Sequence, residues 1–167
     1  MSDLYAEVLV KREATGADRI KKNGLVFLFA ASVLLALFYD YRFLLAAIVL
    51  AAVCFFLLPR MDMEFEYLLV NQELDVDKIY AKSKRKKAAQ FHLEKMEVFA
   101  PLQSDRAARY QGAGSIKVRD YSSGTGGPGV YVMIIREEDG LYRVLLEPDR
   151  QMLDGMLKTF PHKVFVD

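Results

Sequence analysis

The chain has 167 residues, enough for about one domain, and its apolar share of 53% lies slightly above the norm for soluble proteins. Its single cysteine, Cys54, excludes a disulfide within the chain. The formal net charge of +1 averages two unlike regions, because the stretch from Leu25 to Leu58 is almost uncharged while charged residues are dense on both sides of it. The distribution of residues therefore carries more information than their totals.

The first 23 residues form a polar segment, which we assign to the cytoplasm. Within Asp3–Arg12 the apolar side chains fall at helical spacing, at Leu4, Tyr5, Val8 and Leu9. This spacing predicts a short amphipathic helix that lies along the membrane surface or on a soluble domain.

Residues 24–59 contain two apolar runs separated by the short polar turn at Tyr39–Arg42. Each run covers roughly 24 Å as a helix, less than the ~30 Å of a bilayer's hydrocarbon core, so a full span needs flanking residues or local thinning. Neither run offers a polar face to water. The pattern predicts a two-helix transmembrane hairpin, and the alternatives are a re-entrant hairpin and a buried helix pair of a soluble protein.

The residues that flank the apolar block predict its orientation. Basic residues stand before it and after it, whereas the turn carries one Arg and one Asp. Since cytoplasmic loops are enriched in Lys and Arg, we expect a multi-pass protein of the cell membrane with both termini in the cytoplasm. The preceding basic residues are Lys11, Arg12, Arg19, Lys21 and Lys22.

Residues 60–167 predict a separate cytoplasmic domain, rich in β structure and large enough for its own core. A helix at its end should begin near Asp149, and the apolar stripe from Met152 to Phe160 should cover a sheet. We expect Met61–Asp167 to fold alone, as a mainly antiparallel sheet with one C-terminal helix. The predicted strands are Phe65–Val70, Leu74–Ala81, Ala89–Leu93, Met96–Phe99, Ser115–Tyr121, Val130–Arg136 and Leu141–Glu147, with a helical turn or loop at Ser104–Tyr110.

Several segments resemble known bacterial proteins. One strand of the bacterial pleckstrin-homology-like domain is similar to the run Ala89–Phe99. The end of that domain, where its last strand leads into a helix, is similar to Glu147–Pro161. The resemblance implies a bent sheet or partial barrel capped by a helix, and hence a membrane α-helical hairpin plus an α+β soluble domain. Across the whole chain, the hairpin, the basic stretch Lys78–Lys87 and the ending Lys163–Asp167 resemble an uncharacterised family of two-pass membrane proteins from Gram-positive bacteria, a domain of unknown function.

One charged run is a candidate binding site. It holds six cations and no acid, and we expect it in the turn between the second and third strands of the soluble domain. Three roles stay open for it: a topology signal alone, contact with anionic lipid headgroups, and nucleic-acid binding, which the near absence of interleaved aromatic residues disfavours. The residues are Lys78, Lys82, Lys84, Arg85, Lys86 and Lys87.

The remaining motifs predict no catalytic centre, metal site or cofactor. His92 and His162 lack metal-ligand spacing, and we expect both on the surface. The glycine-rich Ser122–Gly129 leads into a strand rather than a helix, so it predicts a mobile hairpin tip instead of a phosphate-binding loop.

The sequence therefore predicts a membrane-anchored, non-enzymatic binding or scaffold module. Its expected partners are the lipid bilayer, anionic headgroups, and a membrane or cytoplasmic protein. The alternative is an enzyme or enzyme subunit that acts on lipid or envelope precursors at the cytoplasmic face of the membrane.

Overall fold

The computed structural model describes residues 5–110 and 116–166, and it divides the chain into two compact units. The β-rich unit comprises residues 1–13, 64–79 and 85–167. The helical unit comprises residues 14–63 together with the short turn 80–84. The helical unit is thus inserted into the sequence of the β-rich unit, near its beginning.

The chain starts with a strand rather than with the amphipathic helix predicted at Asp3–Arg12, of which residues 3 and 4 lie outside the described range. Strand β1 (Tyr5–Lys11) alternates strictly between exposed and buried side chains, with Ala6, Val8 and Val10 buried. It pairs antiparallel with β2 (Met63–Val70), from Tyr5 opposite Val70 to Lys11 opposite Glu64. The helix prediction was wrong because so short a segment fits both the helical and the strand periodicity. Pairing with β2 provides the hydrogen bonds that its backbone needs.

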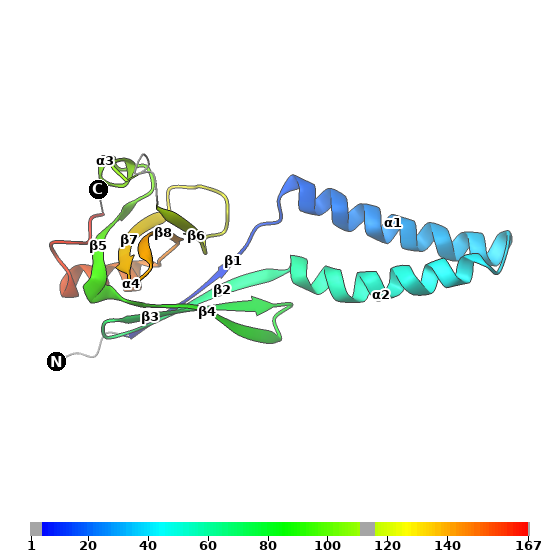
Figure 1. Cartoon of the computed structure of the whole chain (residues 1–167), viewed down its shortest axis with the longest axis horizontal. Coiled ribbons are helices and arrows are strands. Elements are labelled where there is room, and N and C mark those ends of the chain that lie inside the picture. Colours follow the sequence, from blue (N-terminus) through cyan, green and yellow to red (C-terminus); the bar gives the residue numbers. More distant parts are fainter. Residues whose placement is uncertain (1–4, 111–115, 167) are drawn as a thin grey trace. The chain divides into compact units, whose positions relative to one another are not determined.

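Helices α1 (Gly16–Phe38) and α2 (Phe43–Met61) pack side by side in the helical unit (Figure 1). Helix α1 begins well before the predicted apolar run, because Thr15 and Asp18 form a capping box at its start. Among the described helices, α1 alone is long and apolar enough to cross a membrane on length and composition, and the apolar part of α2 is shorter.

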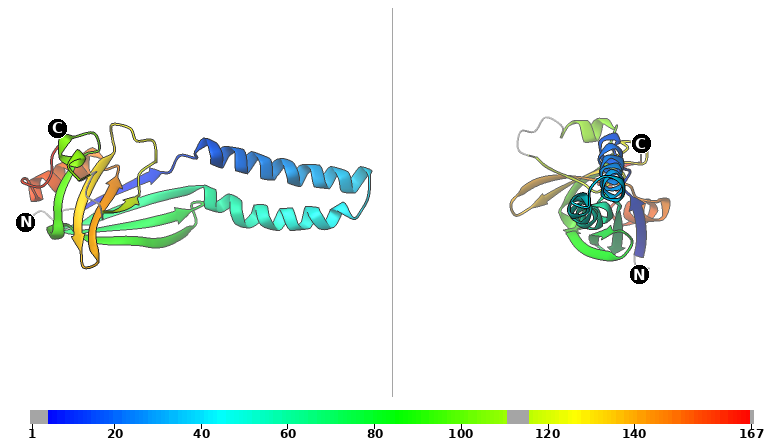
Figure 2. Two further views of the ribbon diagram at one scale, coloured as in Figure 1. Left: turned by 45° about the horizontal axis from the view of Figure 1, so that its top comes forward. Right: turned by 90° about the vertical axis from the view of Figure 1, so that its right-hand side faces the viewer.

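The β-rich unit contains two four-stranded sheets whose strands run in different directions (Figure 2). Sheet A has the order β1-β2-β3-β4, so the predicted meander is confirmed, and sheet B has the order β5-β7-β8-β6. The further strands are β3 (Glu73–Tyr80), β4 (Lys84–His92), β5 (Met96–Pro101), β6 (Lys117–Asp120), β7 (Tyr131–Glu137) and β8 (Gly140–Leu146).

A short 3₁₀ turn, Leu93–Lys95, carries the chain from β4 in sheet A to β5 in sheet B. Between the sheets lies an apolar core that includes Phe65, Tyr67 and Phe91. The ring of Tyr121, which follows β6, stands 5.5 Å from Phe65 and 6.5 Å from Phe91, measured between ring centroids. Aromatic side chains from distant parts of the chain therefore join the two sheets.

Two helices complete the β-rich unit. The C-terminal helix α4 (Arg150–Thr159) begins where it was predicted, since Asp149 accepts a hydrogen bond from the backbone amide of Met152 at 2.7 Å. It buries Met152 and Met156 and packs against β1. The one-turn helix α3 (Asp105–Ala108) covers a smaller apolar cluster on the opposite face of sheet B.

Strand β6 departs from the expected hairpin. It pairs in parallel with β8, at the far side from β7, so Ser122–Gly129 is a crossover connection rather than a hairpin tip. The start of this connection is anchored, because Ser122 and Ser123 are buried and Glu147 accepts hydrogen bonds from the Ser123 amide and hydroxyl at 2.9 and 2.6 Å. The prediction of a mobile tip was therefore wrong for these first residues.

Candidate membrane-lipid interface

The six predicted headgroup-binding cations do not form one cluster in a turn. Strand β4 already begins at Lys84, so Lys84, Arg85, Lys86 and Lys87 are strand residues, and Lys78 lies on β3. Only Lys82 occupies the turn itself. Alternation along the strands sends their side chains to different surroundings, which the sequence run did not reveal.

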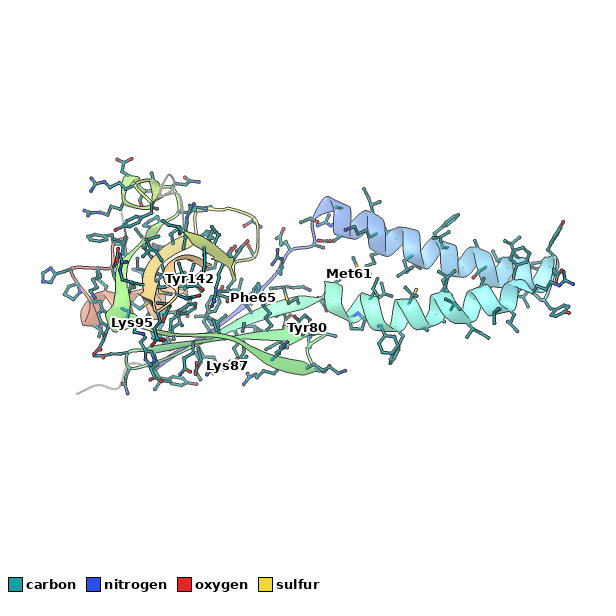
Figure 3. All side chains as sticks on the ribbon, viewed as in Figure 1. Met61, Phe65, Tyr80, Lys87, Lys95 and Tyr142 are labelled. Atoms are coloured by element: carbon teal, nitrogen blue, oxygen red, sulfur yellow. The ribbon has the colours of Figure 1, made fainter. Side chains whose placement is uncertain are left out.

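Two of the cations are paired with acids from the neighbouring strands. The Arg85 guanidinium contacts the Glu66 carboxylate and lies 3.6 Å from Asp77, and the Lys87 ammonium lies 2.9 Å from Asp75. These side chains surround a hollow of about 380 Å³ on the outer face of sheet A. In Figure 3, Phe65 and Lys87 lie on opposite sides of this sheet. The acids that the basic run lacks in sequence are thus supplied across the sheet.

Lys78 is directed to aromatic rings. Its ammonium group lies 6.0 Å from the ring centroid of Phe65 and 5.8 Å from that of Tyr121. A cation at this distance from ring faces gains from their electron density. Lys78 is half-buried, and its contacts with these two rings stabilise the fold of the β-rich unit and distinguish it from the exposed cations of the run.

Three cations remain exposed and have no ion pair within the part of the chain that the structure describes: Lys82, Lys84 and Lys86. The turn that carries Lys82 is fixed within the helical unit, where the Ala81 amide donates a 2.8 Å hydrogen bond to the carbonyl of Asp62. Asp62 directly follows α2. The candidate interface therefore shrinks from six residues to those whose charge is free.

A second polar cluster lies at the β7-β8 hairpin. Asp139 accepts hydrogen bonds at 2.6 Å from both the Lys117 ammonium and the Tyr142 hydroxyl. The bond from Lys117, and then that from Tyr142, lowers the pKa of the Asp139 carboxyl to about 2, and the same contact raises the pKa of Lys117. Asp139 and Tyr142, together with Arg119, border a hollow of about 340 Å³.

The other displaced pKa values belong to tyrosines. Burial raises the pKa of Tyr67, Tyr121 and Tyr131, and a hydrogen bond to Glu7 raises that of Tyr5. All of these displaced values, like those of Asp139 and Lys117, move away from neutral pH. No group of three His, Cys, Asp or Glu side chains placed to hold a metal ion occurs among the described residues. His92 and His162 are exposed, as predicted.

Two four-stranded sheets followed by a C-terminal helix agree with the comparison to protein families. A family model described as a bacterial PH-like domain (DUF6106) matches residues 2–166. The chain belongs to this family. No curated protein and no solved structure matches it.

Membership in the PH-like family confirms the predicted resemblance of the soluble part and extends it to the whole chain. The family match begins before β1 and continues through both helices of the helical unit, so the inserted helices are part of the family's pattern. The match itself says nothing about a membrane. A PH-like domain suggests a binding or scaffold module.

Proposed function

We propose that this protein is a membrane-anchored, non-enzymatic binding or scaffold module that presents its PH-like domain at the cytoplasmic face of the membrane. The exposed apolar surface of the helical unit carries the proposal. Large side chains such as Phe27, Leu37 and Phe55 are more than 70% exposed there. Of the described side chains of α1 and α2, only Ser32 and Ala47 are buried. An apolar surface of this extent is stable in lipid and unfavourable in water.

The turn between α1 and α2 supports a complete crossing. Tyr39 and Tyr41 are exposed, and aromatic rings of this kind favour the interface between lipid and water. The charged pair Asp40–Arg42 lies between them, with 4.0 Å between the nearest oxygen and nitrogen. A re-entrant hairpin would hold these charges inside the hydrocarbon layer at a cost of several kcal/mol, on the order of 3 kcal/mol per charge.

The pairing of β1 with β2 supports a common side for the two ends of the helical unit. Strand β1 precedes α1 and β2 follows α2, yet both belong to one sheet of one folded unit. A sheet cannot form across a bilayer. The entry and the exit of the helix pair therefore face the same compartment, and the basic residues around them favour the cytoplasm.

The displaced pKa values of the described residues offer no candidate for a general acid or base. A general acid or base works best with a pKa near the pH at which the enzyme acts. The displaced pKa values of the described residues all move away from neutrality, and Asp139 stays ionised down to a pH of about 2. The acids on the outer face of sheet A are held by Arg85 and Lys87.

Cysteine labelling of the full chain tests the anchoring and its topology. In a Cys54→Ala background, single cysteines at Tyr41 and Ser83 are treated with a membrane-impermeant maleimide on intact cells. We expect Tyr41→Cys to react from outside and Ser83→Cys to react only after permeabilisation. Labelling of Ser83→Cys in intact cells contradicts the cytoplasmic placement, and release of the protein by alkaline carbonate contradicts the anchoring.

Crosslinking in native membranes tests the binding role. The full chain should recover a defined protein or lipid partner in constant proportion. A variant whose core is opened by Phe91→Ala serves as the control, because it keeps the helices and weakens the packing of the PH-like domain. Equal recovery by both proteins contradicts a binding role for this domain.

A further inference from the structure

The turn between β3 and β4 has a backbone conformation that its residues do not favour. Ala81 and Lys82 have φ angles of +47° and +56°, in the left-handed region where Gly and Asn are the usual residues of tight hairpins. The turn is held by the bond from the Ala81 amide to Asp62 and by a 3.1 Å bond from the Ser83 amide to Tyr80. A lysine in this conformation suggests a function for that residue, because strained backbone conformations cluster at functional sites.

Other cations lie at the same end of the helical unit. Arg19, Lys21 and Lys22 occupy the first turns of α1 and are exposed. Helices α1 and α2 pack side by side and are joined by a short turn, so they run in opposite directions, and the start of α1 lies at the same end as Asp62. We define the cationic collar as Arg19, Lys21, Lys22, Lys82 and Lys84.

Once the apolar runs are in the bilayer, the collar lies within the headgroup layer or just outside it. Lys22 and Arg19 precede Leu25 by three and six residues, which at 1.5 Å per residue is about 4.5 to 9 Å along the helix axis. Asp62, to which the turn is bonded, follows Leu58 by about 6 Å on the same scale. The headgroup layer on each side of the hydrocarbon core is roughly 5 to 7 Å thick.

The collar also has a clear excess of positive charge. The nearby carboxylates within the described part of this unit are Asp18, which is engaged by Thr15, and Asp62. Five cations therefore stand against two acids. Charge of this sign complements the phosphates of anionic lipids, and a cytoplasmic leaflet carries a negative surface potential.

We propose that the cationic collar binds the headgroups of anionic phospholipids, and that Lys82 is kept in its unfavourable conformation for the sake of this contact. The inference rests on the proposed membrane anchoring and adds a lipid class to it. It assigns the contact to residues of α1, of the turn and of the start of β4. It leaves out Lys78, Arg85 and Lys87, which contact partners of the PH-like domain, and Lys86, which belongs to the β-rich unit.

Lipid selectivity of the full chain in reconstituted bilayers tests the proposal. Spin-labelled phosphatidylglycerol and spin-labelled phosphatidylcholine are compared by the fraction of each that is motionally restricted at the protein. We expect the wild type to prefer the anionic lipid at low salt. The preference should fall in 1 M salt, where the Debye length is ~3 Å.

Two double variants separate free from paired cations. Lys82→Gln/Lys84→Gln should weaken the preference by up to about 25-fold, because each cation near the surface contributes roughly fivefold. Arg85→Gln/Lys87→Gln removes the same charge from nearby positions and should leave the preference within about twofold of the wild type, since carboxylates of β2 and β3 already occupy these two cations. Equal loss in both variants, or no loss in the first, overturns the proposal.

The variant Lys82→Gly tests the role of the strained turn. Glycine accepts a φ of +56° without penalty, so the PH-like domain should unfold at the same or a higher temperature while the lipid preference falls. A lower unfolding temperature with unchanged preference overturns the assignment of Lys82. If no restricted lipid of either kind is seen at the protein, the membrane anchoring itself has failed, and this outcome is distinct from a loss of selectivity.

Discussion

The two units of this protein contain similar apolar residues, but one unit buries them and the other exposes them. In the PH-like domain, Phe65 and Phe91 are at most 1% exposed, whereas Phe27 and Phe55 in the helical unit are 72% and 75% exposed. The first unit completes its core with its own strands and helices. In the second unit most apolar side chains stay exposed, because its two helices cover little of each other's surface. The two units therefore contain similar residues, but only the PH-like domain buries them within its own fold.

The largest effect on this contrast is expected from removal of the first strand, β1. A fragment of Met61–Asp167 lacks β1, and with it the buried Ala6, Val8 and Val10 and one edge of sheet A. Burying each valine contributes about 1.5–3 kcal/mol, and total stabilities are only about 5–15 kcal/mol. We therefore expect this fragment to be unfolded, against the expectation from sequence, as judged by circular dichroism and amide exchange.

A matched variant makes this prediction specific. Residues 1–13 are joined by a Gly-Ser linker to residues 64–167, which restores β1 beside β2 through a short hairpin in place of the helices. Because Lys11 and Glu64 are paired neighbours, the linker has only a short gap to close. This shortened chain should be folded and water-soluble. A folded Met61–Asp167 fragment contradicts the need for β1, and a disordered linked chain contradicts the division into two units.

A smaller effect is expected from single phenylalanines in the two units. Phe91→Ala opens a cavity in the core and should destabilise the PH-like domain by roughly 3–5 kcal/mol. Phe27→Ala removes the same side chain from an exposed position and should change its stability by less than about 0.5 kcal/mol. Thermal unfolding of the full chain in detergent, followed by near-ultraviolet circular dichroism of the buried tyrosines, measures both. Similar shifts for the two variants contradict the contrast in burial.

The features that were predictable from sequence are those with long apolar runs or with a clear helical or strand periodicity. The apolar runs predicted α1 and α2, the stripe from Met152 predicted α4, and alternation predicted most strands of both sheets. Strand β1 was missed because its partner β2 lies beyond the inserted helices, and a local pattern of seven residues cannot show a distant pairing. The parallel placement of β6 was missed for the same reason.

The candidate site was harder to predict than the fold. A run of cations shows its charge but not the acids that strands β2 and β3 bring to Arg85 and Lys87. The sequence did contain one signal: Glu66, Asp75 and Asp77 alternate with apolar residues, as expected for the solvent face of a strand pair. The conformation of Ala81 and Lys82 had no signal, because neither residue is typical of a left-handed turn.

The smallest expected effect concerns pH and sharpens the same contrast between paired and free charges. Asp139 is fully exposed, yet its bonds from Lys117 and Tyr142 hold its pKa at about 2, below the ordinary 3.8. A carboxyl whose pKa is lower in the folded state adds stability at a pH above its unfolded value, and this contribution is lost as the pH falls from about 4 to 2.

The wild-type PH-like domain should therefore lose stability across that window more steeply than Asp139→Asn. Asp154→Asn, on the exposed face of α4, removes a carboxylate that has no hydrogen bond or ion pair with the residues that the structure describes, and it should keep the wild-type slope. Urea midpoints of the linked, water-soluble chain between pH 2 and 6 measure the three slopes, and identical slopes for wild type and Asp139→Asn would show that the bonds to Lys117 and Tyr142 do not persist in solution.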